Sequence, residues 1–98
     1  MATIGSDGAG YAARLKAMGI STEFVCEVAN NYTAQAMIMT DRDNNQITAF
    51  HPGAMMQAHI SRIKARSDIK LGMISPDGRD AMLQHAEQFK AAGIPFVF

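Results

Sequence analysis

The sequence has no long apolar run and only one cysteine. None of its apolar stretches approaches the roughly 18 residues that a membrane-spanning helix needs, and the N-terminus does not begin with a basic region followed by an apolar stretch. Cys26 stands alone among 98 residues and cannot form an internal disulfide. These absences predict a chain with no membrane partner that works in the cytoplasm.

The chain also lacks an excess of either charge. Nine Lys and Arg residues balance nine Asp and Glu residues, without a basic run. This balance excludes the electrostatic footprint of a nucleic-acid-binding surface or of an anionic-membrane partner. The three histidines have no spacing typical of zinc ligands, so we expect no metal site.

A hairpin is the clearest feature that is present. Residues 33–40 and 46–51 are rich in Ile, Thr, Met and Phe, and they flank a loop of Asp, Arg and Asn. If Thr40 pairs with Gln46, alternation along the strands sorts the side chains between two faces. One face holds Ala36, Ile38, Thr48 and Phe50, and the other holds Met37, Met39, Ile47 and Ala49. Because both faces are apolar, we expect one to close over a ligand and the other to meet a partner chain.

The remaining pattern predicts an α/β fold, in which a parallel sheet is flanked by helices. We treat residues 1–98 as a single partial α/β domain from which a hairpin of residues 32–51 projects. Strands are expected at 2–4, 24–27, 71–74 and from Pro95, and helices at 8–18, 56–65 and after Asp77, the expected helix cap. The inward-facing helix residues are predicted to be Tyr11, Leu15, Met18, Ile60, Ile63, Met82, Ala86 and Phe89. The very short first strand and the apolar last strand lead us to expect a longer parent protein.

Other patterns suggest chemistry less directly. The segment from Gly8 to Ala13 reads GxGxxA, with Gly10 at its centre and Glu27 further on, which mimics a dinucleotide-binding fingerprint. Three residues separate this segment from the preceding strand, which the fingerprint does not allow. Ser75 has no context typical of a nucleophile, but it follows a predicted parallel strand, at the end where α/β sheets bind ligands.

The residues of the hairpin resemble the lid of the ribokinase-like (PfkB) sugar and nucleoside kinases, and bacterial adenosine-kinase-like members in particular. The resemblance rests on Thr33–Ala36, Thr40–Asp43 and Gln46–Met55. The segment Ile4–Gly10 resembles the G-x-D-x-x-G motif of the family, and Ile74–Leu83 resembles the strand and helix after the lid.

This resemblance implies an ATP-dependent phosphotransferase whose lid closes over a sugar or nucleoside and excludes water. It implies substrate contacts from Ala36, Ile38 and Phe50, with Phe50 able to stack on a purine, and a homodimer made by pairing lids. ATP and Mg²⁺ are implied for the parent enzyme. The Gly-Gly motif of the family and its D-T-x-G-A-G-D segment have no counterpart here. We therefore expect no catalytic base, no ATP site and no phosphate transfer in the isolated chain.

Two other functions remain open at this point. The chain could be a non-catalytic interaction module that dimerises through its hairpin. It could also be half of a dinucleotide-binding domain that uses Gly8, Gly10 and Glu27.

Overall fold

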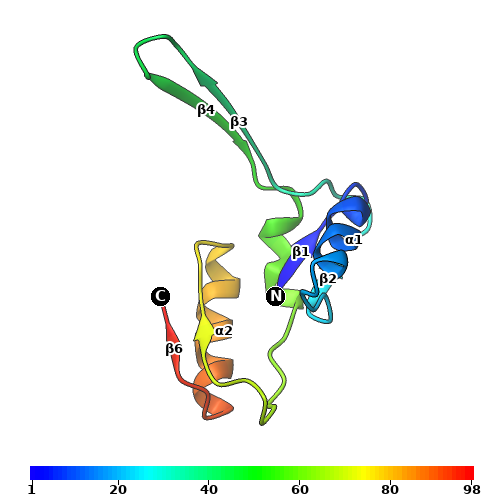
Figure 1. The fold of residues 1–98 in the computed structure, drawn as a ribbon. Helices are drawn as coiled ribbons and strands as arrows, with labels where there is room; N and C mark the ends of the chain where they lie inside the picture. The colour runs from blue at the N-terminus through cyan, green and yellow to red at the C-terminus, as the bar shows by residue number, and fades with distance from the viewer.

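The chain begins with a parallel β-α-β unit, as the computed structural model of residues 1–98 shows (Figure 1). β1 (Ala2–Ile4) leads into α1 (Ala9–Ala17), and β2 (Val25–Glu27) returns to pair with β1 in parallel. α1 is followed by Gly19, whose φ of +74° suits a residue without a Cβ. The predicted strands and the helix between them are confirmed.

The predicted inward face of α1 is wrong in this structure. Tyr11 and Met18 are exposed, and Leu15 is half-buried. Two strands of three residues each make a sheet too narrow to cover the whole apolar side of a helix. α1 therefore contributes no buried residue to the core.

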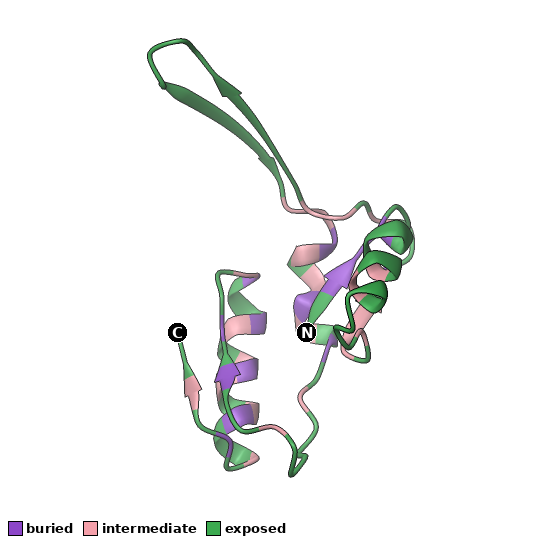
Figure 2. Cartoon of the chain, viewed as in Figure 1, coloured by how far each residue is buried: buried purple, intermediate pink, exposed green.

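The hairpin projects from the rest of the molecule (Figure 1). β3 (Gln35–Thr40) and β4 (Gln46–His51) pair in antiparallel register, and Thr40 lies opposite Gln46 as predicted. Every residue of both strands is exposed, as the uniformly exposed colour of the hairpin in Figure 2 shows. The hairpin is therefore stabilised by its own pairing rather than by burial against the body.

The segment after the hairpin differs from the predicted helix of residues 56–65. A 3₁₀ segment, η1 (Gly53–Ile60), starts three residues earlier and is kinked at Gln57. The chain turns extended at Ser61 because long-range bonds hold it. The Ser61 hydroxyl donates to the Phe24 carbonyl oxygen at 3.2 Å, and the Ile63 N–H donates to Gln88 Oε1 at 2.7 Å.

Two side chains of this segment were predicted to point inward. Ile60 is exposed, which makes its prediction wrong, whereas Ile63 is half-buried against the core of the second unit. The difference follows from the early end of η1. Only the extended segment beyond it reaches α2.

The second unit is another parallel β-α-β arrangement, with shorter strands and a longer helix. β5 (Gly72–Met73) and β6 (Phe96–Val97) pair in parallel, and α2 (Arg79–Ala91) connects them. Its core contains Ile74, Phe89 and Ile94. Met82 and Ala86 pack against these three residues, so the predicted face of α2 is confirmed.

The N-terminus of α2 corrects the expected cap. Gly78 precedes the helix, and no side chain caps it. The Asp77 carboxylate instead accepts a hydrogen bond from the Gly78 N–H at 2.8 Å. Asp77 thus orders the turn before α2 rather than the first turn of the helix.

The predicted α/β class is confirmed, although the strands form three separate two-stranded sheets.

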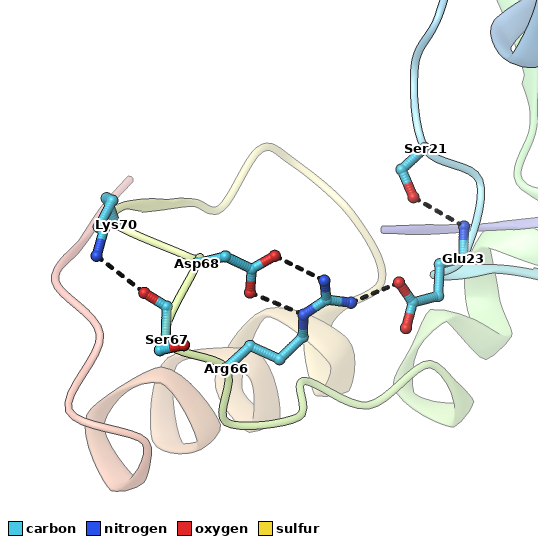
Figure 3. Close-up of polar contacts among 6 residues, drawn as sticks. All are labelled: Ser21, Glu23, Arg66, Ser67, Asp68 and Lys70. Atoms are coloured by element: carbon cyan, nitrogen blue, oxygen red, sulfur yellow. Dashed lines mark hydrogen bonds and ion pairs between the residues drawn. The ribbon is translucent and has the colours of Figure 1, made fainter.

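An ion-pair cluster joins the loop between η1 and β5 to the loop before β2 (Figure 3). Arg66 contacts Glu23 at 2.5 Å and Asp68 at 2.6 Å. The Arg66 guanidinium lowers the pKa of Asp68. None of the helices combines the length and apolar character needed to cross a bilayer.

Replacing Gly53 by Ala tests the junction between the hairpin and the body. Gly53 has a φ of +48°, and a Cβ there would collide with the Tyr32 carbonyl oxygen. We expect Gly53→Ala to lower the free energy of unfolding by about 1–3 kcal/mol. Urea denaturation measures this change.

Gly10→Ala is the matched control, because a Cβ at Gly10 meets open space. We expect it to raise the free energy of unfolding by about 0.4–1 kcal/mol. Equal effects of the two substitutions would contradict the close approach at Gly53.

Candidate functional site

One face of the hairpin brings three predicted site residues together. Ala36 lies opposite Phe50, and Ile38 lies opposite Thr48 on the same face. Phe50 and Ile38 are 54% and 57% exposed. We name the residues Ala36, Ile38, Thr48 and Phe50 the inner face. Its aromatic ring and two aliphatic side chains can cover a planar, partly apolar ligand.

The opposite side of the hairpin is equally apolar. Met37 pairs with Ala49, and Met39 pairs with Ile47. Ile47 is 70% exposed, and both methionines are also exposed. We name these four residues the outer face. The predicted division into two apolar faces is therefore confirmed, and neither face is covered within the chain.

The turn at the tip of the hairpin is ordered by Asp41. Its carboxylate accepts hydrogen bonds from the Asp43 N–H at 2.8 Å and from the backbone and side-chain N–H groups of Asn45 at 2.9 Å. The Asn45 side chain, followed by its backbone, lowers the pKa of Asp41. Asn44 takes a left-handed φ of +63°, which asparagine tolerates. Asp41 acts on the turn, as expected for a loop carboxylate.

The base of β3 is held by a carboxylate from the loop after β1. Asp7 Oδ1 accepts hydrogen bonds from the Thr33 N–H at 2.8 Å and from the Thr33 hydroxyl at 2.7 Å. Asp7 Oδ2 accepts one from the Gln35 side-chain amide at 3.4 Å. Thr33 Oγ1 in turn accepts a bond from the Gly5 N–H at 2.9 Å. The bonds that Asp7 accepts, those from the Thr33 side chain and then the Thr33 backbone first, lower the pKa of Asp7.

The base of β4 is held by backbone contacts. The Ala54 N–H donates to the Tyr32 carbonyl oxygen at 2.8 Å, and the buried Thr3 hydroxyl donates to the Ala54 carbonyl oxygen at 2.8 Å. Gly5 packs so closely on the backbone of residues 31–33 that a Cβ would collide with it. Both strands of the hairpin therefore leave the body from one junction beside β1.

Ser75 lies apart from the inner face. It is an exposed residue after β5 and lines a cavity of about 310 Å³ together with Asp77 and Phe89. His85 also lines this cavity, is buried, and is bonded through Nε2 to the Ser61 carbonyl oxygen at 2.8 Å. The predicted substrate residues thus occupy two places, the hairpin and the end of β5.

Of the two glycines in the dinucleotide-like pattern, Gly8 has a packing role, whereas a Cβ at Gly10 would meet open space. A Cβ at Gly8 would meet the Ile4 side chain at 2.6 Å, so this glycine lets α1 start close to β1. Glu27 is exposed at the end of β2. No three His, Cys, Asp or Glu side chains gather in a way that could hold a metal ion.

Sequence reasoning did not assign roles to Asp7 and His85. Asp7 was part of a quoted motif, but its bonds to Thr33 and Gln35 span more than 25 positions and follow from tertiary folding. His85 had no metal-like spacing. Its i+4 relation to Phe89 and to Ala81 on α2 was the available signal for burial.

Comparison with solved structures identifies the fold. A nucleoside kinase of Burkholderia thailandensis in complex with inosine is 52% identical to the chain, with a TM-score of 0.91. The match covers 100% of this chain and 33% of that one. The ligand-free form of the same kinase matches 98% of this chain and 32% of that one, at 52% identity and a TM-score of 0.84.

A nucleoside kinase of Methanocaldococcus jannaschii, described as an archaeal member of the ribokinase family, is more distant. It is 27% identical, with a TM-score of 0.74 over 88% of this chain and 29% of that one. No protein-family model matches the chain. The chain spans about a third of the length of the kinases that it matches.

These matches define the chain first as a ribokinase-like α/β structure with a projecting hairpin. The chain is similar along its whole length to a nucleoside kinase at 52% identity, and it is similar at 27% identity to an archaeal member of the ribokinase family. The predicted resemblance is confirmed.

Acid should release the Asp7 contacts. Because its pKa is lowered in the folded state, Asp7 contributes stability that is present above its unfolded pKa of about 3.8 and is lost as the pH falls through the lower folded value. We expect the Asp7 carboxyl carbon to titrate below 3.8 by NMR, together with the Thr33 amide proton. A midpoint at or above 3.8, or a Thr33 amide that does not follow it, would contradict these bonds.

Proposed function

We propose that the complete gene product is an ATP-dependent kinase that phosphorylates a hydroxyl of adenosine, inosine or a related nucleoside or sugar. The proposal is carried by the 52% identity along the whole chain to a kinase solved with inosine. The same kinase has been solved with ADP-inosine, which supports ATP as the phosphate donor. In this proposal the 98 residues supply the lid and part of the α/β body.

The lid works by covering the substrate. When the hairpin closes, its inner face meets the nucleoside, and Phe50 stacks on the base while Ala36 and Ile38 exclude water. Excluding water favours transfer of phosphate to the nucleoside over its loss to hydrolysis. Ser75, at the carboxyl end of a parallel strand, is a second candidate for substrate contact.

ATP supplies the phosphoryl group, and Mg²⁺ offsets the negative charge on its phosphates. Two observations support the proposal that this chain binds neither group: no three His, Cys, Asp or Glu side chains gather in a way that could hold a metal ion, and Gly8 packs against the Ile4 side chain. We propose that both are bound by other parts of the complete protein, which would leave the isolated chain inactive.

The outer face is proposed to pair two lids in a homodimer. Met37, Met39, Ile47 and Ala49 form an apolar strip on a hairpin that the body does not cover. Exposed apolar strips of this kind are typical of protein–protein contacts. The same strip is the observation that favours the second candidate function, an interaction module without catalysis.

A kinase assay with Phe50 variants tests the proposed function. The complete gene product should convert ATP and inosine or adenosine to ADP and the nucleoside monophosphate. Phe50→Ala should raise the KM for the nucleoside about 5- to 150-fold, through the loss of about 1–3 kcal/mol of stacking. Phe50→Tyr, which keeps the ring, is the matched control.

The Michaelis constant for ATP should stay unchanged in both variants, because the inner face is assigned to the nucleoside. A wild-type protein with no activity on any nucleoside or sugar would overturn the kinase proposal. An unchanged nucleoside KM in Phe50→Ala would overturn the role of Phe50.

Charge on the outer face tests the homodimer. Ile47→Asp places a carboxylate in the centre of the strip and should convert a dimer to a monomer in sedimentation-velocity experiments. Asp43→Asn at the hairpin tip is the control and should leave the mass unchanged. A wild-type protein that sediments as a monomer, or an Ile47→Asp variant that remains a dimer, would refute the pairing of lids.

A further inference from the structure

The hairpin is attached to the body only at its base. Its strands pair with each other, and all their residues are exposed (Figure 2). The bonds that hold it lie at residues 31–35 and at Ala54. A long projection that is fixed at one end swings about that end unless the fixing bonds set its angle. The direction of the inner face is therefore decided at the base.

Asp7 is the body side chain that reaches across this pivot. Its Oδ1 binds the backbone and hydroxyl of Thr33, just before β3, and its Oδ2 binds the side chain of Gln35, the first residue of β3. The Asp7 carboxylate thus binds one residue before β3 and the first residue of β3. The bonds at Ala54 connect the chain beyond the end of β4 to Tyr32 and Thr3, and neither of them reaches a residue of β3.

Thr33 completes the connection to the body. Its hydroxyl donates to Asp7 and accepts from the Gly5 N–H, which links the carboxylate to the end of β1. Thr33 is therefore hydrogen-bonded to both Gly5 and Asp7, which lie in the loop directly after β1. Hydrogen bonds to a charged acceptor are stronger than those between neutral groups. The Asp7 carboxylate is therefore suited to holding the base of a long, projecting hairpin in place.

From this geometry we propose that Asp7 is a positioning residue, which sets the angle of the lid through Thr33 and Gln35 and so keeps the inner face aimed at the substrate. The proposal rests on the proposed function. Loss of the Asp7 bonds would let the hairpin sample many directions, of which few can close. The apparent affinity for the nucleoside falls in proportion to the closing-competent fraction.

Matched variants in the complete gene product test this role. Asp7→Asn replaces one accepting oxygen by a donor that faces the Gln35 amide, and Thr33→Val removes the hydroxyl while keeping the shape. Thr33→Ser keeps the hydroxyl, and Asp43→Asn removes a charge without touching the base. The first two variants should raise the nucleoside KM about tenfold with kcat nearly unchanged, and they should lower the thermal midpoint only slightly because the lost bonds are exposed. The last two should match the wild type.

The lid angle is measured separately by double electron–electron resonance spectroscopy. Spin labels at Arg42→Cys on the tip and Glu87→Cys on α2, in a background without native cysteines, report the distance between the hairpin and the body. The distribution should broaden in Asp7→Asn and Thr33→Val and stay narrow in Thr33→Ser and Asp43→Asn.

Unchanged distributions in the first two variants would overturn the proposal. So would a parallel loss of kcat and thermal stability, because that result indicates a general folding role. A wild-type protein that phosphorylates no nucleoside would refute the proposed function, whereas the distance measurement would still decide whether Asp7 holds the hairpin.

Discussion

The junction between residues 31–33 and the end of β1 is the contact on which the placement of the hairpin depends. Gly5 and Gly53 allow the backbones to approach more closely than any Cβ would permit. Within that approach, Thr3 and Thr33 donate and accept the bonds that tie both ends of the hairpin to one strand. A hairpin that buries nothing of its own can keep a direction only through such a junction.

The same hairpin explains why so much apolar surface is uncovered. Only 15 of 98 residues are buried, and the hydrophobic cluster of Ile74, Phe89 and Ile94 contains three of them. Met73 at 73% exposure and Ile47 at 70% exposure lie on strands with no neighbour on one side. Surfaces of this kind are stabilised by contact with other protein or with ligand. This agrees with a chain that spans about a third of the kinases that it matches.

The register of the hairpin was predictable because two local signals agreed, although β3 begins at Gln35 rather than at Thr33. Alternating side chains fixed the faces, and an Asp-Asn loop fixed the Thr40–Gln46 register. Gly19 and Gly93, which follow α1 and α2, take left-handed φ values of +74° and +67°, and a glycine after a helix is likewise a local signal. The resemblance to a kinase family, which the comparison confirms, also rested mainly on this segment.

The sequence-based predictions were wrong or incomplete where contacts between distant segments determine the structure. The prediction of a helix at 56–65 was wrong because hydrogen bonds from Ser61 and Ile63 to other segments hold the chain in an extended conformation. Tyr11 was misplaced because helical spacing indicates an apolar side but not whether the sheet is wide enough to cover it. Asp7 was missed because no spacing along the chain reveals a bond across more than 25 residues.

The central claim, a lid that closes its inner face over a nucleoside, is tested most directly by a crystal structure of the complete gene product with a bound nucleoside. The account predicts the Phe50 ring in van der Waals contact with the base and Ala36 and Ile38 beside it. A nucleoside bound elsewhere, with the inner face still in solvent, would contradict it.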